Sequence, residues 1–317
     1  MKGYAVLTFL AVLIVLLTPF AAYPRTPSAV PPSGETPHET APINDAVFKV
    51  KNTANGEILT MSEEDFLIGV VSCEMAPSSP TEALKAQTVA AYTYYCKQRA
   101  AAADGVFSNV PETLFTVGTA DGLKQRLGDK YDELYGKMQE IVRAVKGQTL
   151  TYDGELITAC YHAISAGVTD SAEDVWGGEY PYLQPVDSSG DLTVDGYQSE
   201  VKISYDAAVK ALQSIHADFK PDQAPEKWFG TLITTDSGLV KTATICGKEF
   251  TGTKLRTALD LRSAVFTAAY ADNTFTFTVK GYGHNVGMSQ MGAKYMANQG
   301  AAYKEILAHY YPHTKLV

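Results

Sequence analysis

The sequence predicts an α+β fold, with a single globular domain of helices and antiparallel or mixed β-hairpins. Segments with helical periodicity and segments with strand-like alternation both occur, but they do not alternate regularly, which disfavours a doubly wound parallel sheet. The chain has 317 residues, 45% of them hydrophobic, enough for one large core or two smaller ones. A formal net charge of −9 and the lack of a basic stripe argue against a nucleic-acid partner.

Residues 1–23 are predicted to be a transmembrane anchor or a signal peptide. The apolar run Tyr4–Leu17 has the length of a signal-peptide core or a short membrane anchor. Pro19 and Phe20 fit the small-x-small pattern of a cleavage site poorly, which favours an uncleaved anchor. We therefore expect a single-pass protein of the cell membrane whose remaining chain lies outside the cytoplasm.

Residues 24–43 are predicted to be a disordered stalk. Six of the fifteen prolines lie there, among serine, threonine and glycine, with almost no large apolar residue. Such a composition buries too little apolar surface to fold, and proline keeps the chain extended. The globular domain is therefore expected over residues 44–317.

The first elements of this domain follow from local patterns. Residues 47–52 read as a short strand. Residues 62–75 read as a helix, because Ser62 can cap it, three acids occupy its first turn and Pro77 follows it. A longer helix is expected over 79–103, with Ser79 as its cap, Pro80 at the first helical position and Glu82 completing a capping box.

The later elements mix hairpins, strands and helices. The first hairpin turns at Asp153-Gly154, because this dipeptide suits a two-residue β-turn. Strict alternation in 273–281 is typical of a half-buried strand. The remaining predictions are a helix over 204–215, a hairpin over 239–252 and a final helix over 301–311.

Glu74 is the first candidate for chemistry. It follows two valines, lies between Cys73 and Met75, and precedes a proline break, so its carboxyl is expected to be desolvated. Desolvation raises the pKa of a carboxyl group, and an acid still protonated near neutral pH can protonate a leaving oxygen. The alternative from local sequence is a glutamate at a frayed helix end that faces water.

Other residues suit a binding cleft but carry weak signals alone. Gln87 and Tyr92 are polar members of the Ala-rich helix, where packing is the alternative. His162 and Ser165 precede three acids, but such a cluster is too common to indicate a Ser/His/acid triad. Trp176, in a Gly-rich and Pro-rich segment with nearby tyrosines, suggests an aromatic rim for sugar rings; core packing is the alternative.

The cysteines and the remaining histidines point to no metal or thiol chemistry. None of the four cysteines forms a CxxC pair, which argues against a zinc ribbon, and buried free thiols are favoured over disulfides. Cys73 lacks the basic surroundings of a catalytic thiolate. His309 and His313 have helical metal spacing, but Pro312 interrupts the helix between them.

Four stretches taken together resemble one family. They are CEMAPSSPTEALKAQTVAAYTYY, YHAISAGVTDSAEDVWGGEYPYL, LRSAVF and GYGHNVGMSQMGA. They occur in the order seen in the stage II sporulation protein D family, which also includes the amidase-enhancer type called LytB. The resemblance extends from about Phe48 to Val317, and four ordered motifs are far more specific than any one of them.

The resemblance implies a function and partners. Family members include membrane-anchored lytic transglycosylases that cut peptidoglycan glycan strands between N-acetylmuramic acid (MurNAc) and N-acetylglucosamine (GlcNAc), leaving a 1,6-anhydro sugar. Their preferred strands have lost their stem peptides to an amidase, stage II sporulation protein P. Stage II sporulation protein M holds the assembly together at the septum during forespore engulfment.

The resemblance also assigns residues. The catalytic glutamate of the family maps onto Glu74, and the glycan cleft is expected to contain other polar and aromatic residues: Gln87, Tyr92, His162, Ser165, Trp176, His284, Ser289 and Gln290. Some members bind zinc through a His/Cys cluster after the catalytic helix. Residues 97–159 contain neither residue type, so no metal and no cofactor are expected here.

Four positions depart from the family pattern. Tyr92 replaces an arginine implicated in activity, and Asn285 and Ala166 replace glycines. Met291 replaces an aromatic residue. These departures keep open a second function, that of a catalytically weak or inactive glycan-binding scaffold that supports an amidase.

Overall fold

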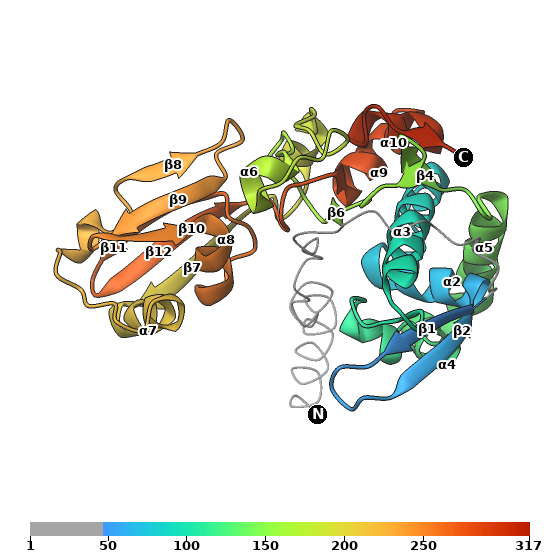
Figure 1. Ribbon diagram of the computed structural model, residues 1–317, viewed down its shortest axis with the longest axis horizontal. Helices are drawn as coiled ribbons and strands as arrows, with labels where there is room; N and C mark the ends of the chain where they lie inside the picture. The colour runs from blue at the N-terminus through green and yellow to red at the C-terminus, as the bar shows by residue number, and fades with distance from the viewer. Residues whose placement is uncertain (1–46) are drawn as a thin grey trace, which may run out of the picture.

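The computed structural model describes residues 47–317, so the predicted anchor and stalk lie outside the described residues. Within this part the prediction of a mixed α+β domain with antiparallel sheets is confirmed. Its buried apolar side chains form two large clusters, and we call the surrounding structures the first lobe (residues 47–193 and 284–317) and the second lobe (residues 198–280). Figure 1 shows the lobes side by side along the long axis, with the chain passing from one to the other and back.

Helices dominate the first lobe (Figure 1). The helices are α2 (Glu63–Glu74), α3 (Thr81–Ala101), α4 (Ala120–Leu127), α5 (Tyr131–Ala144), α6 (Ala172–Trp176), α9 (Gln290–Asn298) and α10 (Tyr303–Tyr310). The strands are β1 (Val47–Lys51), β2 (Ile58–Ser62), β3 (Val106–Phe107), β4 (Leu150–Tyr152), β5 (Glu155–Leu156), β6 (Tyr161–His162), β13 (Met288–Ser289) and β14 (Lys315–Leu316). They pair in the orders β2-β1-β3, β14-β4-β5 and β13-β6.

The central helix of this lobe is α3. It packs against α2, α5, α9 and α10, and its middle is almost entirely buried. Ser62 caps α2 as predicted, because its hydroxyl accepts a hydrogen bond from the Asp65 amide at 3.1 Å.

The predicted start of α3 is wrong. Pro80 is the N-cap rather than the first helical residue, and it offers neither a side-chain acceptor nor an N–H for a capping box. Glu82 instead forms an ion pair with Lys85 and accepts a hydrogen bond from the Tyr303 amide, so it ties α3 to α10.

The second lobe contains two three-stranded sheets and two longer helices. The sheet β11-β12-β7 consists of β7 (Gln198–Ser204), β11 (Phe266–Ala271) and β12 (Thr274–Lys280), and the sheet β10-β9-β8 of β8 (Leu232–Thr234), β9 (Val240–Ile245) and β10 (Lys248–Thr251). The helices are α7 (Tyr205–Ile215) and α8 (Gly252–Ala258). As predicted, β12 alternates in burial, because Phe275, Phe277 and Val279 point into the second core.

Short 3₁₀ turns complete the described chain. They are η1 (Glu112–Phe115), η2 (Gly128–Lys130), η3 (Ser189–Thr193) and η4 (Pro225–Lys227). Within residues 47–317, no helix combines the length and apolar character needed to cross a bilayer.

The chain returns from the second lobe through the glycine-rich turn 281–287. This turn leads into β13, which pairs in parallel with β6 so that Ser289 lies opposite His162. Gly283 has φ of +125°, and an added Cβ there would overlap the His162 side chain. The glycines of this turn therefore allow it to approach β6 closely.

Candidate active site

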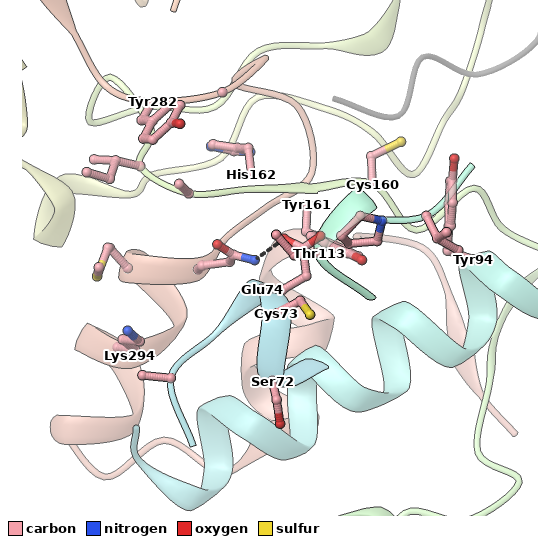
Figure 2. A pocket seen from close by; sticks show the side chains of 18 of the residues that line it. Ser72, Cys73, Glu74, Tyr94, Thr113, Cys160, Tyr161, His162, Tyr282 and Lys294 are labelled. Carbon is pink, nitrogen blue, oxygen red and sulfur yellow. Dashed lines mark hydrogen bonds between the residues drawn. The ribbon is translucent and has the colours of Figure 1, made fainter. Parts of the chain in front are cut away.

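A cavity of about 590 Å³ opens at the carboxyl end of α2. Glu74 is the last residue of α2, and its side chain lies in this cavity (Figure 2). The lining comes from distant parts of the sequence, including β6, α9 and, from the second lobe, Arg256 and Leu261. Both lobes therefore contribute to the cavity, and Glu74 is the sole carboxyl group among the described residues that line it.

Burial raises the pKa of Glu74 from 4.5 to about 7. The opposing influence is a hydrogen bond at 3.2 Å from Nε2 of Gln290 to Oε2 of Glu74, which favours the ionised form. The position also disfavours negative charge, since a helix carries partial negative charge at its carboxyl end and the last turn of α2 contains no basic residue. Glu74 can therefore hold a proton near neutral pH.

The local fold fixes the position of Gln290. Ser289 caps α9 by accepting a hydrogen bond from the Gly292 amide at 3.1 Å, so Gln290 is the first residue of the helix. The parallel pairing of β13 with β6 places this start beside His162. This pairing thus joins two segments more than 100 residues apart, and the dashed line in Figure 2 marks the hydrogen bond that Gln290 donates to Glu74.

Two buried histidines, His162 of β6 and His284 of the turn before β13, contact each other beside the cavity. Nδ1 of His162 lies 3.1 Å from the Val286 carbonyl and must donate to it, whereas Nδ1 of His284 accepts from the Val286 amide at 3.1 Å. Burial lowers the pKa of His162 to about 4 and lowers that of His284 well below its usual range, so both rings are neutral at pH 7. The ring of His284 also contacts His162 and Trp176, at centroid distances of 5.4 and 4.9 Å.

Tyrosines form much of the remaining lining. Tyr94, Tyr95, Tyr161 and Tyr282 all line the cavity. Burial raises the pKa values of Tyr95 and Tyr161 well above the usual value, and the nearby Glu74 carboxyl raises both further. These hydroxyls therefore stay protonated beside the acid, and the rings present apolar faces of the kind that stack on sugars.

Comparison with known proteins shows the family of this chain. The family model described as stage II sporulation protein matches residues 51–152. The chain is 32% identical over 283 residues to stage II sporulation protein D of Bacillus subtilis (strain 168), covering 88% of this chain and 81% of that protein. This chain belongs to the stage II sporulation protein D family.

Two further relatives extend the comparison. Stage II sporulation protein D of Bacillus amyloliquefaciens is 32% identical over 329 residues, covering 98% of this chain and 92% of that protein. The protein named amidase enhancer of Bacillus subtilis (strain 168) is 29% identical over 299 residues, covering 79% of this chain and 40% of the longer relative.

Three of the site residues predicted from the resemblance to the stage II sporulation protein D family line one cavity. They are Glu74, His162 and Gln290. His284 and Trp176 do not line the cavity themselves. His284 contacts the lining residue His162, and Trp176 contacts His284. Ser165 and Ser289 are fully buried, and both hydrogen-bond to the buried carboxyl of Asp191. They therefore stabilise the structure around β6 and β13 and do not line the cavity.

Gln87 and Tyr92 do not line the cavity. The Tyr92 hydroxyl donates to Glu63 at 2.9 Å, at the opposite end of α2 from Glu74. Gln87 is fully buried within α3, and its amide atoms have no hydrogen-bond partner among the described residues. The expectation that both face Glu74 across the cleft is therefore not met, because α3 presents its neighbours Tyr94 and Tyr95 to the cavity instead.

The departures from the family pattern now have locations. Asn285 is buried with φ of +67°, a left-handed conformation that asparagine tolerates. Its side chain donates to the Val168 carbonyl at 2.9 Å and to Asp170 at 2.6 Å, and accepts from the Ala166 amide at 2.9 Å. Met291 lines the cavity, whereas Asn285 points away from it into the loop 166–170.

Sequence reasoning missed several lining residues, including Tyr161, Tyr282, Arg126, Arg256 and Lys294. Tyr161 and Tyr282 stand directly beside motif histidines or glycines, which is a usable signal. The three basic residues carry no local signal, because only the tertiary fold assembles them.

Proposed function

We propose that this protein is a lytic transglycosylase that cleaves the MurNAc–GlcNAc bonds of peptidoglycan glycan strands and forms 1,6-anhydroMurNAc. The observation that carries the proposal is a lone carboxyl group with a pKa of about 7 in a tyrosine-lined cavity. Ordinary glycosidases use a pair of carboxyl groups, one as acid and one as nucleophile or base. A cavity lined by one carboxyl group suits a reaction in which the substrate supplies its own nucleophile.

The reaction needs Glu74 in both protonation states. The protonated carboxyl first donates its proton to the glycosidic oxygen, and the bond from that oxygen to C1 of MurNAc breaks. The resulting carboxylate then accepts the proton of the C6 hydroxyl as O6 attacks C1 of the same sugar. Because the nucleophile belongs to the substrate, it is already positioned, and Glu74 ends the cycle protonated.

Gln290 is suited to assist the second half of this cycle. Its amide donates to a carboxyl oxygen of Glu74, and this hydrogen bond strengthens when the acid becomes a carboxylate. The neutral histidines add no positive charge that would hold Glu74 ionised before the reaction starts. The site therefore favours the protonated form of Glu74 before the reaction, and it still stabilises the carboxylate that forms once the proton has been donated.

Family membership supports a proposed setting for this activity. We propose that the protein acts on septal peptidoglycan during forespore engulfment, on strands that an amidase has stripped of stem peptides. Its proposed partners are stage II sporulation proteins P and M. The proposed location is the cell membrane, with residues 1–23 as the anchor and the catalytic domain outside the cytoplasm.

A second candidate function is a glycan-binding scaffold that enhances an amidase. It is supported by the similarity to the protein named amidase enhancer and by Tyr92, which stands where the family has an arginine implicated in activity. In this case the cavity would bind glycan without cleaving it.

Product analysis separates these functions. Purified protein is incubated with peptide-free glycan strands, and anhydro-sugar products are quantified by mass spectrometry. We expect Glu74→Gln to reduce product formation by at least about 100-fold, since general acid–base catalysis contributes about 10²–10⁴-fold.

The matched control for this experiment is Glu140→Gln. Glu140 is exposed on α5, outside the cavity, and the substitution makes the same chemical change. The control should retain full activity. Equal and negligible product from the wild type and Glu74→Gln would exclude the transglycosylase and leave the scaffold function.

A further inference from the structure

The second lobe contacts the first through the turn between β8 and β9, residues 235–239. At this junction a small apolar cluster is buried, which consists of Leu239, Ala264 and Val265 packed against Ala166 and Val175. Lys241, just beyond the turn, forms an ion pair with Asp174 at 2.6 Å, but both side chains are partly exposed, so the pair contributes little. Because apolar contact is non-directional, the angle between the lobes depends largely on hydrogen bonds at this junction.

Asn285 is at the centre of these hydrogen bonds. Its side chain is buried, and the contacts described above use its oxygen and its amino group within residues 166–170 of the first lobe. Its backbone carbonyl accepts a further hydrogen bond from the Asp170 amide at 2.6 Å. An asparagine side chain offers one acceptor oxygen and two donor hydrogens, and all of them are used here. Asn285 therefore acts through its protein neighbours and not through a ligand.

Asp170 links Asn285 to the second lobe. The same carboxyl oxygen, Oδ2, accepts a hydrogen bond from Asn285 at 2.6 Å and another from the Ser237 hydroxyl at 2.7 Å. Asp170 is buried, and burial raises the pKa of its carboxyl group, whereas the hydrogen bonds from Asn285 and Ser237 oppose that rise. A buried carboxyl group is costly unless donors surround it, so the loss of either donor weakens the junction.

The turn is also tied to the part of the second lobe that lines the cavity. The Val240 amide donates a hydrogen bond to the Ala264 carbonyl at 2.9 Å, so the end of the turn lies against the segment 259–265. This segment contains Leu261, the preceding helix α8 contains Arg256, and both residues line the cavity. Glu74 and its donor Gln290 belong to the first lobe. A change in the angle between the lobes therefore moves one side of the cavity and leaves the acid in place.

We propose that Asn285 is a positioning residue, which acts through Asp170 and Ser237 to hold the second lobe at the angle that keeps Arg256 and Leu261 in the lining of the cavity. The kinetic consequence rests on the proposed function, whereas the effect on the lobes does not. Binding of a glycan strand uses both sides of the cavity, but proton transfer uses the first lobe alone. Loss of the Asn285 side chain should therefore weaken strand binding and spare the chemical step.

Distances between the lobes test this proposal without any reaction. Nitroxide labels are attached to ketone-bearing amino acids that replace the exposed residues Glu140 on α5 and Lys210 on α7 in the full-length protein. This chemistry leaves the native cysteines unlabelled. Pulsed electron paramagnetic resonance then gives the distribution of distances between the two labels. We expect one narrow distribution in the otherwise unchanged protein and a clearly wider one in Asn285→Gly.

The choice of variants separates the side chain from the backbone. Glycine at position 285 keeps the left-handed conformation, with φ of +67°, and removes only the amide side chain. The matched control is Asn273→Gly, the same change at φ of +58° in the exposed turn between β11 and β12, and it should leave the distribution narrow. Ser237→Ala removes the second-lobe donor and should widen the distribution. Because both changes break one junction, the double variant should be no wider than Asn285→Gly.

Kinetics on peptide-free glycan strands give a second measurement, which a purely structural role would not move in the same way. If about one-tenth of the Asn285→Gly molecules hold the competent angle, KM should rise about tenfold, because apparent affinity scales with the competent fraction. Saturating strands restore the competent angle, so kcat should stay within about twofold of the wild-type value. Adding Asn285→Gly to the Glu74→Gln protein should weaken strand binding by the same factor, which measures the effect without cleavage.

Each outcome decides the positioning role. Distributions that stay narrow in both Asn285→Gly and Ser237→Ala would overturn it, and so would a loss of kcat at unchanged KM. If Asn285→Gly does not fold, the distribution in Ser237→Ala decides alone. A wider distribution with weaker strand binding, in a protein whose wild type cleaves no strand, would sustain the positioning role and refute the transglycosylase. Cleavage by the wild type together with narrow distributions in both variants would do the reverse.

Discussion

At the residue scale, the main property of Glu74 is that it is an acid whose surroundings oppose its ionisation. Its pKa is raised from 4.5 to about 7 in the folded protein, so the unfolded chain releases this proton at lower pH than the folded chain. Between pH 4.5 and about pH 7, the folded protein therefore binds more protons than the unfolded chain. The stability contributed by the protonated acid is therefore fully present below pH 4.5 and is lost as the pH rises to about 7.

This linkage gives a testable pH dependence. We expect the free energy of unfolding, measured with urea at pH 4.5 and pH 8, to fall with pH by at most about 3 kcal/mol more in the wild type than in Glu74→Gln. The two proteins share all other titrating groups, so these cancel in the comparison. Parallel pH dependences would show that Glu74 titrates normally in the folded state.

Asn285 shows what sequence reasoning can and cannot give at this scale. The resemblance identifies it as a side chain in place of a glycine, next to His284, which was expected in the glycan cleft. The structure instead places its amide in hydrogen bonds to the loop 166–170, away from the cavity. A departure from a motif is visible in sequence, but the direction of a side chain depends on which distant backbone lies beside it.

At the scale of elements, α9 joins the wall of the cavity to the rest of the first lobe. Gly292 lies where this helix packs on the hydrogen-bonded pair of Ser188 and Tyr310, whose hydroxyl oxygens are 2.7 Å apart. An added Cβ at Gly292 would overlap both hydroxyls. The glycine therefore allows the close approach that positions Gln290.

We expect Gly292→Ala to destabilise the protein by about 1–3 kcal/mol, because overpacking displaces a buried, hydrogen-bonded pair. The matched control is Gly136→Ala on α5, where an added Cβ meets no atom within 4 Å. That change should stabilise the protein by about 0.5–1 kcal/mol through helix propensity. Urea unfolding measures the free energy of unfolding of both variants. If Gly292→Ala stabilised the protein as much as Gly136→Ala, the close approach of Gly292 to Ser188 and Tyr310 would be refuted.

Local signals predicted several elements with their types but missed others, including the helices α4 and α5. The hairpin at Asp153-Gly154 is confirmed, with both residues at positive φ, and so are the Ser62 cap of α2 and the helix predicted over 204–215. The start of α3 was misplaced because a capping box was read where proline is the cap. The pairing of β6 with β13 could not be predicted, since two-residue strands carry no periodicity and their partners are more than 100 residues apart.

At the scale of the whole molecule, the two lobes have separate hydrophobic cores. Trp228 is fully buried in the second core, while Trp176 packs against the first, and these are the two tryptophans of the chain. The junction between the lobes includes a small apolar cluster around Leu239 and Val265 and a hydrogen bond at 2.7 Å from Ser237 to Asp170. Each lobe is therefore expected to unfold largely on its own.

The tryptophans make this separation measurable. We expect Trp228→Phe to lower the urea midpoint of a second-lobe transition followed by circular dichroism and to leave the fluorescence midpoint of Trp176 unchanged. Trp176→Phe provides the matched variant, in which fluorescence reports the second lobe alone. A shift of the Trp176 midpoint in Trp228→Phe would show that the lobes unfold as one unit.

The composition and motifs predicted the mixed fold and the acid, but not the basic side of the cavity. Arg126, Arg256 and Lys294 come from three helices and two lobes, and none lies in a recognisable pattern. A charge cluster made by tertiary structure becomes visible only when the chain is folded.

The pairing of β6 with β13 has a consequence for how the site matures. The acid stands near the beginning of the described chain, whereas the amide that contacts it stands near the end. A nascent or clipped chain that stops before α9 has the α2 sequence but lacks both Gln290 and Lys294. Under the proposed function, the complete site therefore forms only once the last segment of the chain has docked.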